Sequence, residues 1–402
     1  MTPSRTVSAL KTAWDGKAKH ACKSFRNFAP AMKDIRKFSL EEMVTEFEQL
    51  KEPKFRAKQV YEWLWKKSAR SFDEMTSLSK DLRVKMQEQF LLQPVQEHLV
   101  QKSKDGTVKL GMSLHDKLLV EGVMIPDEDR NTACVSSQVG CSLSCSFCAT
   151  GFLKRERNLD SGEIYDQVVL LNKYALEYSN KPLTNIVYMG MGEPLLNYDN
   201  VMKSIRIITS PEGLNMAQKR ITVSTSGIAR GITRLTDEGM KFNLALSLHA
   251  PTDEKRDKIM EINLSNNLET VMEALTYFHQ KTGNKVTFEY ILFDKFNDSI
   301  EDADNLIKLY NKVPSFINLI EYNNVEGVTL KKAKSEKRNE FVAYLRNKGV
   351  NVAVRRSRGK DIDAACGQLA NKNESPILNP SPKGKDFKRH PHPKSFSEGE
   401  GL

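Results

Sequence analysis

The stretch Cys141-Ser-Leu-Ser-Cys145-Ser-Phe-Cys148 brings three cysteines together in the spacing CxxxCxxC. Thiolate sulfur is the ligand that iron–sulfur clusters select, and a cubane [4Fe–4S] cluster usually takes four such ligands. Three clustered cysteines can hold three irons and leave the fourth iron open to an external ligand. The alternative is a zinc site, but zinc sites usually show CxxC pairs and complete a fourth ligand. The spacing therefore favours an open cluster over zinc.

Strand-like and helical segments alternate along the chain from Asn131 onward. The predicted strands are Ile186–Met189, Arg220–Ser224, Phe242–Leu248, Lys285–Phe293, Phe316–Tyr322 and Val350–Arg356. Amphipathic stretches such as Asn266–Thr282 and Glu301–Lys312 separate them. Repeated βα units imply a parallel sheet with helices outside it. The pattern predicts an α/β fold with a partial (βα)6-type barrel over residues 131–369.

Polar motifs follow four of these predicted strands. They are Gly190-Met-Gly192-Glu193-Pro, Ser224-Thr-Ser-Gly, Ser247-Leu248-His249 and Glu321-Tyr-Asn323. In such barrels the chemistry lies at the carboxyl ends of the strands. A glycine-rich turn followed by a carboxylate suits a zwitterionic ligand, because backbone groups and Glu193 can bind an α-ammonium group. We therefore expect one ligand site at this rim.

The residues before the barrel divide into three parts. Residues 1–37 carry nine Lys or Arg against Asp15 and Asp34, and a disordered basic arm is predicted. Residues 38–96 read as a small helical accessory domain of an RNA-binding type, with Phe55, Val60, Tyr61, Leu64 and Trp65 at helical spacing and the aromatic rings in its core. Residues 97–130 read as a β-hairpin linker that turns at Asp105-Gly106. A disordered tail is predicted for residues 370–402.

The net charge of +10 indicates a polyanionic partner, but most of the excess lies in the two ends of the chain. RNA binding by the core must therefore use local basic runs. The candidates are Lys154, Arg155 and Arg157; Lys331, Lys332 and Lys334; and Arg355, Arg356, Arg358 and Lys360.

No apolar run predicts a membrane span or a secretion signal, and clustered cysteines suit a reducing compartment, so a cytoplasmic protein is predicted.

Further motifs complete a family pattern. Cys134-Val-Ser-Ser-Gln-Val-Gly-Cys141 leads into CxxxCxxC, GMGEPLLN and STSG follow, and Asp361-Ile-Asp-Ala-Ala-Cys366-Gly-Gln-Leu369 stands near the end. Together these motifs resemble the RlmN/Cfr family of radical S-adenosylmethionine (SAM) RNA methyltransferases, over about residues 38–369. The sequence around the cysteines is more similar to the RlmN branch. Cys22 belongs to no motif.

The resemblance implies a role for each motif residue. Cys141, Cys145 and Cys148 would bind a [4Fe–4S] cluster. SAM would be bound by Gly192, Glu193, Ser224, Ser247, Leu248, His249 and Asn323. Cys366 would be methylated by one SAM, and a second SAM would be cleaved to a 5′-deoxyadenosyl radical that takes hydrogen from that methyl group. Glu121 matches the proposed proton acceptor. Cys134 would attack Cys366 to release the product as a disulfide forms.

This chemistry fits a substrate that ordinary methylation cannot use. Carbon 2 of adenine is electron-poor and cannot attack a sulfonium methyl group, whereas a carbon radical can add to it. The predicted reaction is methylation of adenosine carbon 2 in 23S rRNA and tRNA, by a monomer that receives electrons from flavodoxin or ferredoxin. One alternative is the carbon-8 methylation of the Cfr branch. The other is a non-catalytic RNA-binding protein with a structural cluster.

Overall fold

A single mixed sheet of ten strands organises residues 32–371, the part of the chain that the computed structural model describes. Its order is β14-β13-β12-β11-β10-β9-β6-β5-β4-β3. The strands from β6 to β14 pair in parallel, with aligned registers such as Leu246 opposite Phe288. These parallel strands are β6 (Asn131–Cys134), β9 (Asn185–Tyr188), β10 (Ile221–Thr225), β11 (Asn243–Ser247), β12 (Val286–Leu292), β13 (Ser315–Glu321) and β14 (Val352–Arg355).

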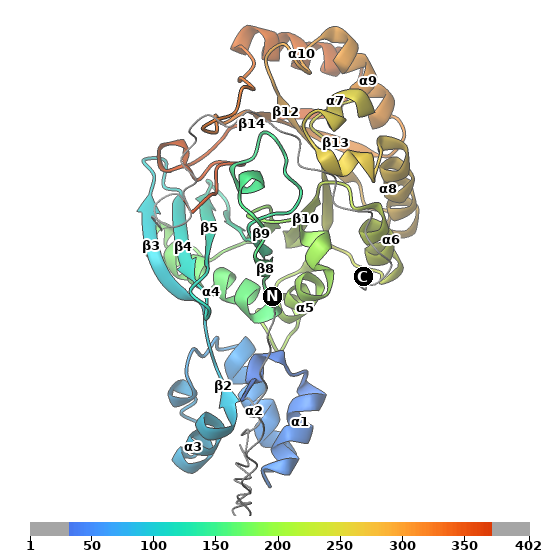
Figure 1. Cartoon of the computed structure of the whole chain (residues 1–402). Helices are drawn as coiled ribbons and strands as arrows, with labels where there is room; N and C mark the ends of the chain where they lie inside the picture. The colour runs from blue at the N-terminus through green and yellow to red at the C-terminus, as the bar shows by residue number, and fades with distance from the viewer. Residues whose placement is uncertain (1–31, 372–402) are drawn as a thin grey trace, which may run out of the picture.

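Helices connect these strands and lie around the outside of the sheet (Figure 1). They are α4 (Ser161–Ser179), α5 (Tyr198–Thr209), α6 (Ala229–Asp237), α7 (Asp253–Asp257), α8 (Leu268–Thr282), α9 (Ile300–Tyr310) and α10 (Ser335–Asn347). Each helix buries one stripe; in α5, for example, Val201, Ile205 and Ile208 are fully buried at helical spacing. Six βα units followed by β14 confirm the predicted fold class. Of the parallel strands, only β6 was missing from the predicted set; its sequence, Asn-Thr-Ala-Cys, lacks the run of large apolar residues that marks β9 and β14.

The residues predicted as a hairpin linker form three antiparallel strands of the same sheet. β3 (Gln96–Lys102), β4 (Val108–Ser113) and β5 (Leu119–Pro126) continue the sheet beyond β6. The turn at Asp105-Gly106 lies where it was predicted, with Gly106 at a φ of 85°. Residues 97–130 are therefore part of the barrel sheet, which is why the sheet is mixed rather than parallel throughout.

The helical domain consists of α1 (Leu40–Gln49), α2 (Lys54–Trp65) and α3 (Lys80–Gln89). Ser39 and Glu42 form a capping box that begins α1, with Glu42 N donating to Ser39 Oγ at 3.1 Å. The core contains Phe47, Val60 and Leu64. The prediction that the aromatic residues are buried is wrong for Phe55, which is 55% exposed, because it lies on the solvent side of α2.

The basic arm was predicted to extend to residue 37, but its last residues are ordered. Lys33–Asp34 form β1, which pairs in parallel with β2 (Phe90–Leu91), and Ile35–Lys37 form a 3₁₀ turn, η1. Ile35 is fully buried. The arm's first 31 residues, including Cys22, and the predicted tail from residue 372 lie outside the described residues. No helix of residues 32–371 is long and apolar enough to cross a membrane.

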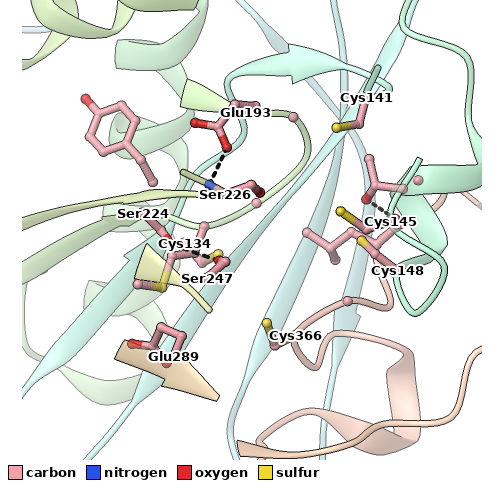
Figure 2. Close-up of a pocket in the computed structure, with 18 of the residues that line it drawn as sticks. Cys134, Cys141, Cys145, Cys148, Glu193, Ser224, Ser226, Ser247, Glu289 and Cys366 are labelled. Atoms are coloured by element: carbon pink, nitrogen blue, oxygen red, sulfur yellow. Dashed lines mark hydrogen bonds between the residues drawn. The ribbon is translucent and has the colours of Figure 1, made fainter. Parts of the chain in front are cut away.

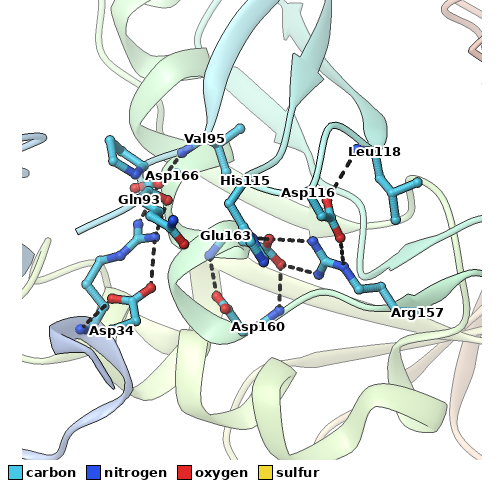
Figure 3. Close-up of polar contacts among 12 residues, drawn as sticks. Asp34, Gln93, Val95, His115, Asp116, Leu118, Arg157, Asp160, Glu163 and Asp166 are labelled. Carbon is cyan, nitrogen blue, oxygen red and sulfur yellow. Dashed lines mark hydrogen bonds and ion pairs between the residues drawn. The ribbon is translucent and has the colours of Figure 1, made fainter. Parts of the chain in front are cut away.

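A buried ion pair joins the helical domain to the barrel (Figure 3). Arg36 Nη1 donates to Asp166 Oδ2 of α4 at 2.6 Å, and Nη2 donates to the carbonyl of Gln93 at 2.6 Å. Val95 N donates to the same Asp166 oxygen at 2.8 Å. Nearby, the ring of Trp65 meets that of Tyr165 edge-on at 5.1 Å. Charge and aromatic packing together orient the helical domain on α4.

The segment after β14 returns across the sheet to β3–β5. Gly359 N donates to Asp105 Oδ2 at 2.9 Å, and Ser103 Oγ donates to Asp361 Oδ1 at 2.5 Å. Partial burial would raise the pKa of Asp105, but hydrogen bonds from Gly359, Thr107 and Ser103 lower it to about 2. The remaining short elements are β7 (Gln138–Val139), β8 (Arg157–Asn158), η2 (Phe72–Glu74), η3 (Ala149–Phe152), η4 (Pro194–Asn197), η5 (Gln218–Arg220), η6 (Glu261–Leu264) and η7 (Lys360–Ile362).

We predict that Asp166→Asn lowers the free energy of unfolding by about 3 kcal/mol, because it removes the nearer of the two carboxylates that pair with the buried Arg36 guanidinium and leaves only Asp34, at 3.6 Å. Urea unfolding followed by circular dichroism measures this loss. The double variant Arg36→Met/Asp166→Asn should recover part of it. As a control, Glu254→Gln breaks the exposed Lys258–Glu254 pair and should change stability by less than about 0.5 kcal/mol. Equal effects of the two carboxylate variants would contradict the prediction.

Candidate active site

One cavity opens at the carboxyl ends of the parallel strands. It collects ten of the thirteen predicted site residues, although they are spread from β6 to the end of the described chain. These ten are Cys134, Cys141, Cys145, Cys148, Gly192, Glu193, Ser224, Ser247, His249 and Cys366. In Figure 2 the three clustered cysteines face Glu193, Ser224 and Ser247 across the pocket. Three of the four polar motifs predicted at this rim contribute to the lining of this one cavity.

The three clustered cysteines lie on a loop whose base is closed by the pairing of β7 with β8. Inside the loop, Gly151 packs against the cysteine segment. A Cβ on Gly151 would lie 2.7 Å from the carbonyl oxygen of Cys145, so only glycine allows this approach. Burial raises the pKa of Cys141 to about 12, and it raises the pKa of Cys145 and Cys148 as well. Bare thiols here would stay protonated at neutral pH, and a metal must displace those protons to bind.

The donor set fits an iron–sulfur cluster better than a single ion. Within residues 32–371, no group of three or more His, Cys, Asp or Glu side chains is arranged to hold one metal ion. Yet Cys141, Cys145 and Cys148 line one cavity. The sulfurs of a cubane cluster each bind a different iron, so they need not converge on one point as zinc ligands do. Three thiols on one cavity therefore fit the donor set of such a cluster.

The turn after β9 holds Glu193 beside the cysteine loop. Glu193 N donates to Gln138 Oε1 at 2.9 Å, and the same Gln138 donates through Nε2 to Asn158 Oδ1 at 2.8 Å. Gly192 has a φ of 94°, and a Cβ there would lie 2.5 Å from Gln138 Cβ. Gln138, which sequence reasoning did not single out, thus links the base of the cysteine loop to the turn that carries the carboxylate.

The Glu193 carboxylate accepts two backbone hydrogen bonds inside the cavity wall. Ser226 N donates to Oε2 at 2.7 Å, and Leu195 N donates to Oε1 at 3.1 Å. Burial raises the pKa of Glu193, and these bonds oppose that rise. A buried carboxylate is costly unless a cation accompanies it. The site therefore suits a ligand with a positively charged group, as predicted for an α-ammonium.

His249 connects β11, β12 and the cysteine loop. Its Nδ1 accepts a hydrogen bond from Ile291 N at 3.2 Å, and its ring meets the ring of Phe147 edge-on at 4.8 Å. Burial, with the nearby Arg256 charge, lowers the pKa of His249 to about 3. His249 is therefore neutral at physiological pH and cannot act there as an acid. Its neighbour Ser247 approaches Ser224 with their hydroxyl oxygens 3.4 Å apart.

Cys134 and Cys366, from opposite ends of the barrel sequence, line the same cavity. Cys134 ends β6 and is buried, whereas Cys366 lies on the return segment and can be reached from solvent. Every cysteine in the described range is a free thiol. Burial raises the pKa of Cys134 to about 12, and the dense protein surroundings raise that of Cys366 to about 11. The Arg355 guanidinium opposes both rises.

Glu289 and Arg355 line the cavity but were not predicted as site residues. Glu289 Oε1 accepts from Asn318 Nδ2 at 2.9 Å, while Oε2 has no hydrogen-bond partner among the described residues. Arg355 Nη1 lies 3.9 Å from that oxygen. A signal for Glu289 was available, since it is an acid within the otherwise apolar run of β12. Arg355 was visible only as part of a basic run.

The other three predicted residues do not line the cavity. Leu248 lies in the core, and its carbonyl accepts from Arg256 Nε at 3.2 Å. Asn323 Nδ2 donates to the carbonyl of Cys366 at 3.3 Å. Glu121 points from the same face of β5 as Val123 and Ile125, which do line the cavity. Its Oε1 pairs with Lys109 Nζ at 3.1 Å, and its Oε2 accepts from Ala370 N at 2.8 Å.

Internal ion pairs use several residues of the predicted RNA-binding runs. Arg157 binds both oxygens of Glu163 at 2.7 Å and Asp116 Oδ2 at 2.6 Å (Figure 3). Lys332 and Lys360 both pair with Glu321 Oε2, at 2.9 and 3.3 Å. The charge of Arg157 is thus neutralised by two carboxylates, whereas Lys332 and Lys360 share the single Glu321 carboxylate with Arg338.

Comparison with known proteins agrees with this geometry. Residues 135–307 match the radical SAM superfamily, and residues 33–92 match the ribosomal RNA large subunit methyltransferase N-terminal domain. A crystal structure of a radical SAM methyltransferase from Sphaerobacter thermophilus aligns with a TM-score of 0.80 at 39% identity, covering 84% of this chain and 99% of that one. The fold and the cysteine loop thus define a radical SAM enzyme.

The curated relatives narrow the assignment. A probable dual-specificity RNA methyltransferase RlmN from Cytophaga hutchinsonii is 56% identical over 338 residues, which cover 84% of this chain and 93% of the relative. A protein with the same description from Streptococcus gordonii is 44% identical over 333 residues, covering 82% and 92%. The chain belongs to the RlmN family of radical SAM RNA methyltransferases.

We predict that alkylation of Cys366 by iodoacetamide accelerates about tenfold for each pH unit between pH 7 and 9. The thiolate is the reacting form, and a pKa of about 11 keeps its fraction rising across this whole range. Anaerobic peptide mass spectrometry measures the rate, with a short unstructured cysteine peptide as the control, whose rate should rise by much less than tenfold per pH unit once the pH passes its pKa of about 8.5. Arg355→Gln should slow the reaction, because it removes a cation that favours the thiolate. A plateau for Cys366 below pH 9 would contradict the prediction.

Proposed function

We propose that this protein methylates carbon 2 of adenosine in 23S rRNA and tRNA, with Cys366 carrying the methyl group as S-methylcysteine. One observation carries the proposal: Cys366 and Cys134, far apart in the sequence, line the same cavity as the three-cysteine loop and Glu193. The relatives' description as dual-specificity RNA methyltransferases supports RNA as the substrate.

The cofactor roles follow the family resemblance. Cys141, Cys145 and Cys148 would hold a [4Fe–4S] cluster, which when bound supplies the electron for reductive cleavage of SAM. Glu193 would bind the SAM ammonium, which supplies the cation that its buried carboxylate needs. The other proposed SAM contacts are Gly192, Ser224, Ser247, Leu248, His249 and Asn323. Of these, Leu248 can contribute only backbone groups or apolar contact, and Asn323 would also hold the Cys366 loop through its bond to the Cys366 carbonyl.

The two thiols would act in sequence and consume two SAM molecules per turnover. The Cys366 thiolate takes a methyl group from the first SAM by displacement, and S-adenosylhomocysteine leaves. After hydrogen abstraction from that methyl group, its carbon adds to carbon 2 of the adenine. The resulting adduct would lose one electron, back to the electron-donor chain, and its carbon-2 proton. Cys134 would then attack the Cys366 sulfur, which breaks the sulfur–carbon bond and forms a disulfide, and the released carbon would take up a proton to become the methyl group. The free thiols and the proximity of Arg355 to both support this exchange.

Glu121 is proposed as the acceptor of the adenine carbon-2 proton. Its position on the cavity-facing side of β5 supports this role. Its hydrogen bonds from the Ala370 and Asn371 amides also make it an anchor for the segment that follows Cys366. To accept a proton at the base, the carboxylate would exchange these amide contacts for the substrate.

The two alternative functions are supported less well than carbon-2 methylation. Carbon-8 methylation, as in the Cfr branch, uses the same cysteines, but the N-terminal domain match and the relatives favour the RlmN branch. A non-catalytic protein with a structural cluster would give the paired thiols Cys134 and Cys366 no task. We also propose a low-potential flavodoxin or ferredoxin as electron donor, a monomer as the working form, and the reducing cytoplasm as the compartment.

The test is mass spectrometry of nucleosides after anaerobic incubation of the reconstituted protein with SAM, a reductant and target RNA. We expect 2-methyladenosine from the wild-type protein and none from Cys366→Ala. Cys22→Ala, which alters a cysteine outside the motifs, is the control and should retain the product. Detection of 8-methyladenosine instead would move the protein to the other branch.

The release step has its own prediction. Cys134→Ala lacks the attacking thiol, so the RNA should remain attached to Cys366 through a methylene bridge. Denaturing gel electrophoresis with labelled RNA would reveal a covalent complex, and nuclease digestion followed by mass spectrometry would locate it on Cys366. Release of free 2-methyladenosine by Cys134→Ala at the wild-type rate would exclude the proposed role of Cys134.

A further inference from the structure

A groove on the surface leads directly to Cys366. One wall is the β5–β6 corner, from Ile125 to Thr132, and the other is the segment from Val354 to Arg358 that leaves β14. We call it the basic groove. It forms where the return segment after β14 comes back beside the antiparallel part of the sheet.

The walls of the basic groove carry four arginines and one acid. Arg130, Arg355, Arg356 and Arg358 line it together with Asp127. Asp127 is shared, lying 3.3 Å from Arg130 Nη2 and 3.8 Å from Arg358 Nη2. Arg356 is exposed and has no ion-pair partner among residues 32–371. The groove therefore keeps an excess of positive charge.

The inner end of the groove is the outer end of the active-site cavity. Ile125, Ile320, Arg355, Ala364, Ala365 and Cys366 line both. The basic outer part thus passes into an inner part, and the walls that the two share are mainly apolar. This arrangement suits a nucleotide. Its charged phosphate would lie in the basic outer part, and its flat, largely apolar base would lie in the inner part.

Geometry also requires the base to leave its stack. Cys366 lies within the passage, so the reacting carbon of a base within a helix could not reach its sulfur. Enzymes that act on a base take it out of the stack and insert it into a pocket, and RNA loops offer bases that are already unstacked. The target must therefore enter as an extruded nucleotide.

We propose that the basic groove binds the RNA phosphates flanking the target adenosine, with Arg130, Arg356 and Arg358 as the contacts, while the target base passes Arg355 into the cavity. The proposal rests on the proposed function. It selects one of the three basic runs found in the sequence. The other two gain less support, because Arg157 and Lys332 are held by internal carboxylates and neither run lines the passage to Cys366.

The test is the salt dependence of RNA affinity, measured by fluorescence anisotropy with a labelled RNA hairpin that carries an adenosine in its loop. The variant is Arg130→Gln/Arg356→Gln/Arg358→Gln. Each phosphate contact contributes about 0.7 to the slope of log affinity against log salt for single strands. Loss of three contacts should therefore make the slope shallower by about 2 and weaken binding about a hundredfold at 0.1 M salt.

A matched control removes three charges from the opposite rim. Lys219, Arg220 and Lys241 are exposed and precede the amino ends of β10 and β11, and they have no ion-pair partners among the described residues. Lys219→Gln/Arg220→Gln/Lys241→Gln should leave the slope within about 0.5 of the wild-type value. Conversely, Asp127→Asn removes the groove's acid and should tighten binding several-fold. Circular dichroism would establish that each variant is folded.

The outcomes separate this proposal from the proposed function. Equal slopes for the groove variant, the control variant and the wild-type protein would overturn the basic groove as the RNA site, even if the wild-type protein makes 2-methyladenosine. Mass spectrometry of Cys366 after incubation with SAM, without RNA, reports the first methyl transfer on its own. A wild-type protein that shows the groove-dependent slope but never methylates Cys366 would contradict the proposed function and leave the groove standing.

Discussion

Parallel hydrogen bonding between β6 and β9–β14 is the constraint on which the site depends. Parallel neighbours must end at the same edge, so every loop that follows a strand opens on one rim. The cysteine loop after β6, the Glu193 turn after β9 and the serines that end β10 and β11 share that rim for this reason alone. These residues therefore need not be neighbours in the sequence to lie at one rim.

A partial barrel leaves a gap between its first and last parallel strands. In this chain, segments from both sides of that gap contact each other. The antiparallel strands β3–β5 extend the sheet beyond β6, and the return segment after β14 docks on them through Asp105, Ser103 and Glu121. Cys366 lies between these anchors. The same arrangement forms the basic groove, so the device that positions the reactive thiol also creates the passage to it.

Burial gives the site its electrostatic character. The cavity raises the pKa of its thiols and of Glu193 and Glu289, because charge is costly where water is excluded. Burial therefore disfavours the ionised form of these groups until a cation approaches. Arg355 supplies a cation beside both reactive thiols, and SAM would bring a sulfonium and an ammonium group. The site is therefore suited to a cationic cosubstrate.

The sequence by itself indicated the fold class, the positions of most parallel strands and the motifs that reach the cavity, because these depend on local patterns. Hydrophobic periodicity revealed the βα units, and CxxxCxxC, GMGEP and the motif around Cys366 each mark a site within a few residues. Tertiary structure alone decided what lies beside what. It placed Glu121 against Lys109 and the Ala370 amide, turned Asn323 toward the Cys366 carbonyl, and brought Glu289 and Arg355 into the cavity. It also neutralised Arg157 and left Arg356 free of ion pairs within the described chain. Such pairings join residues far apart in the sequence, and no local pattern encodes which distant side chain will meet a given charge.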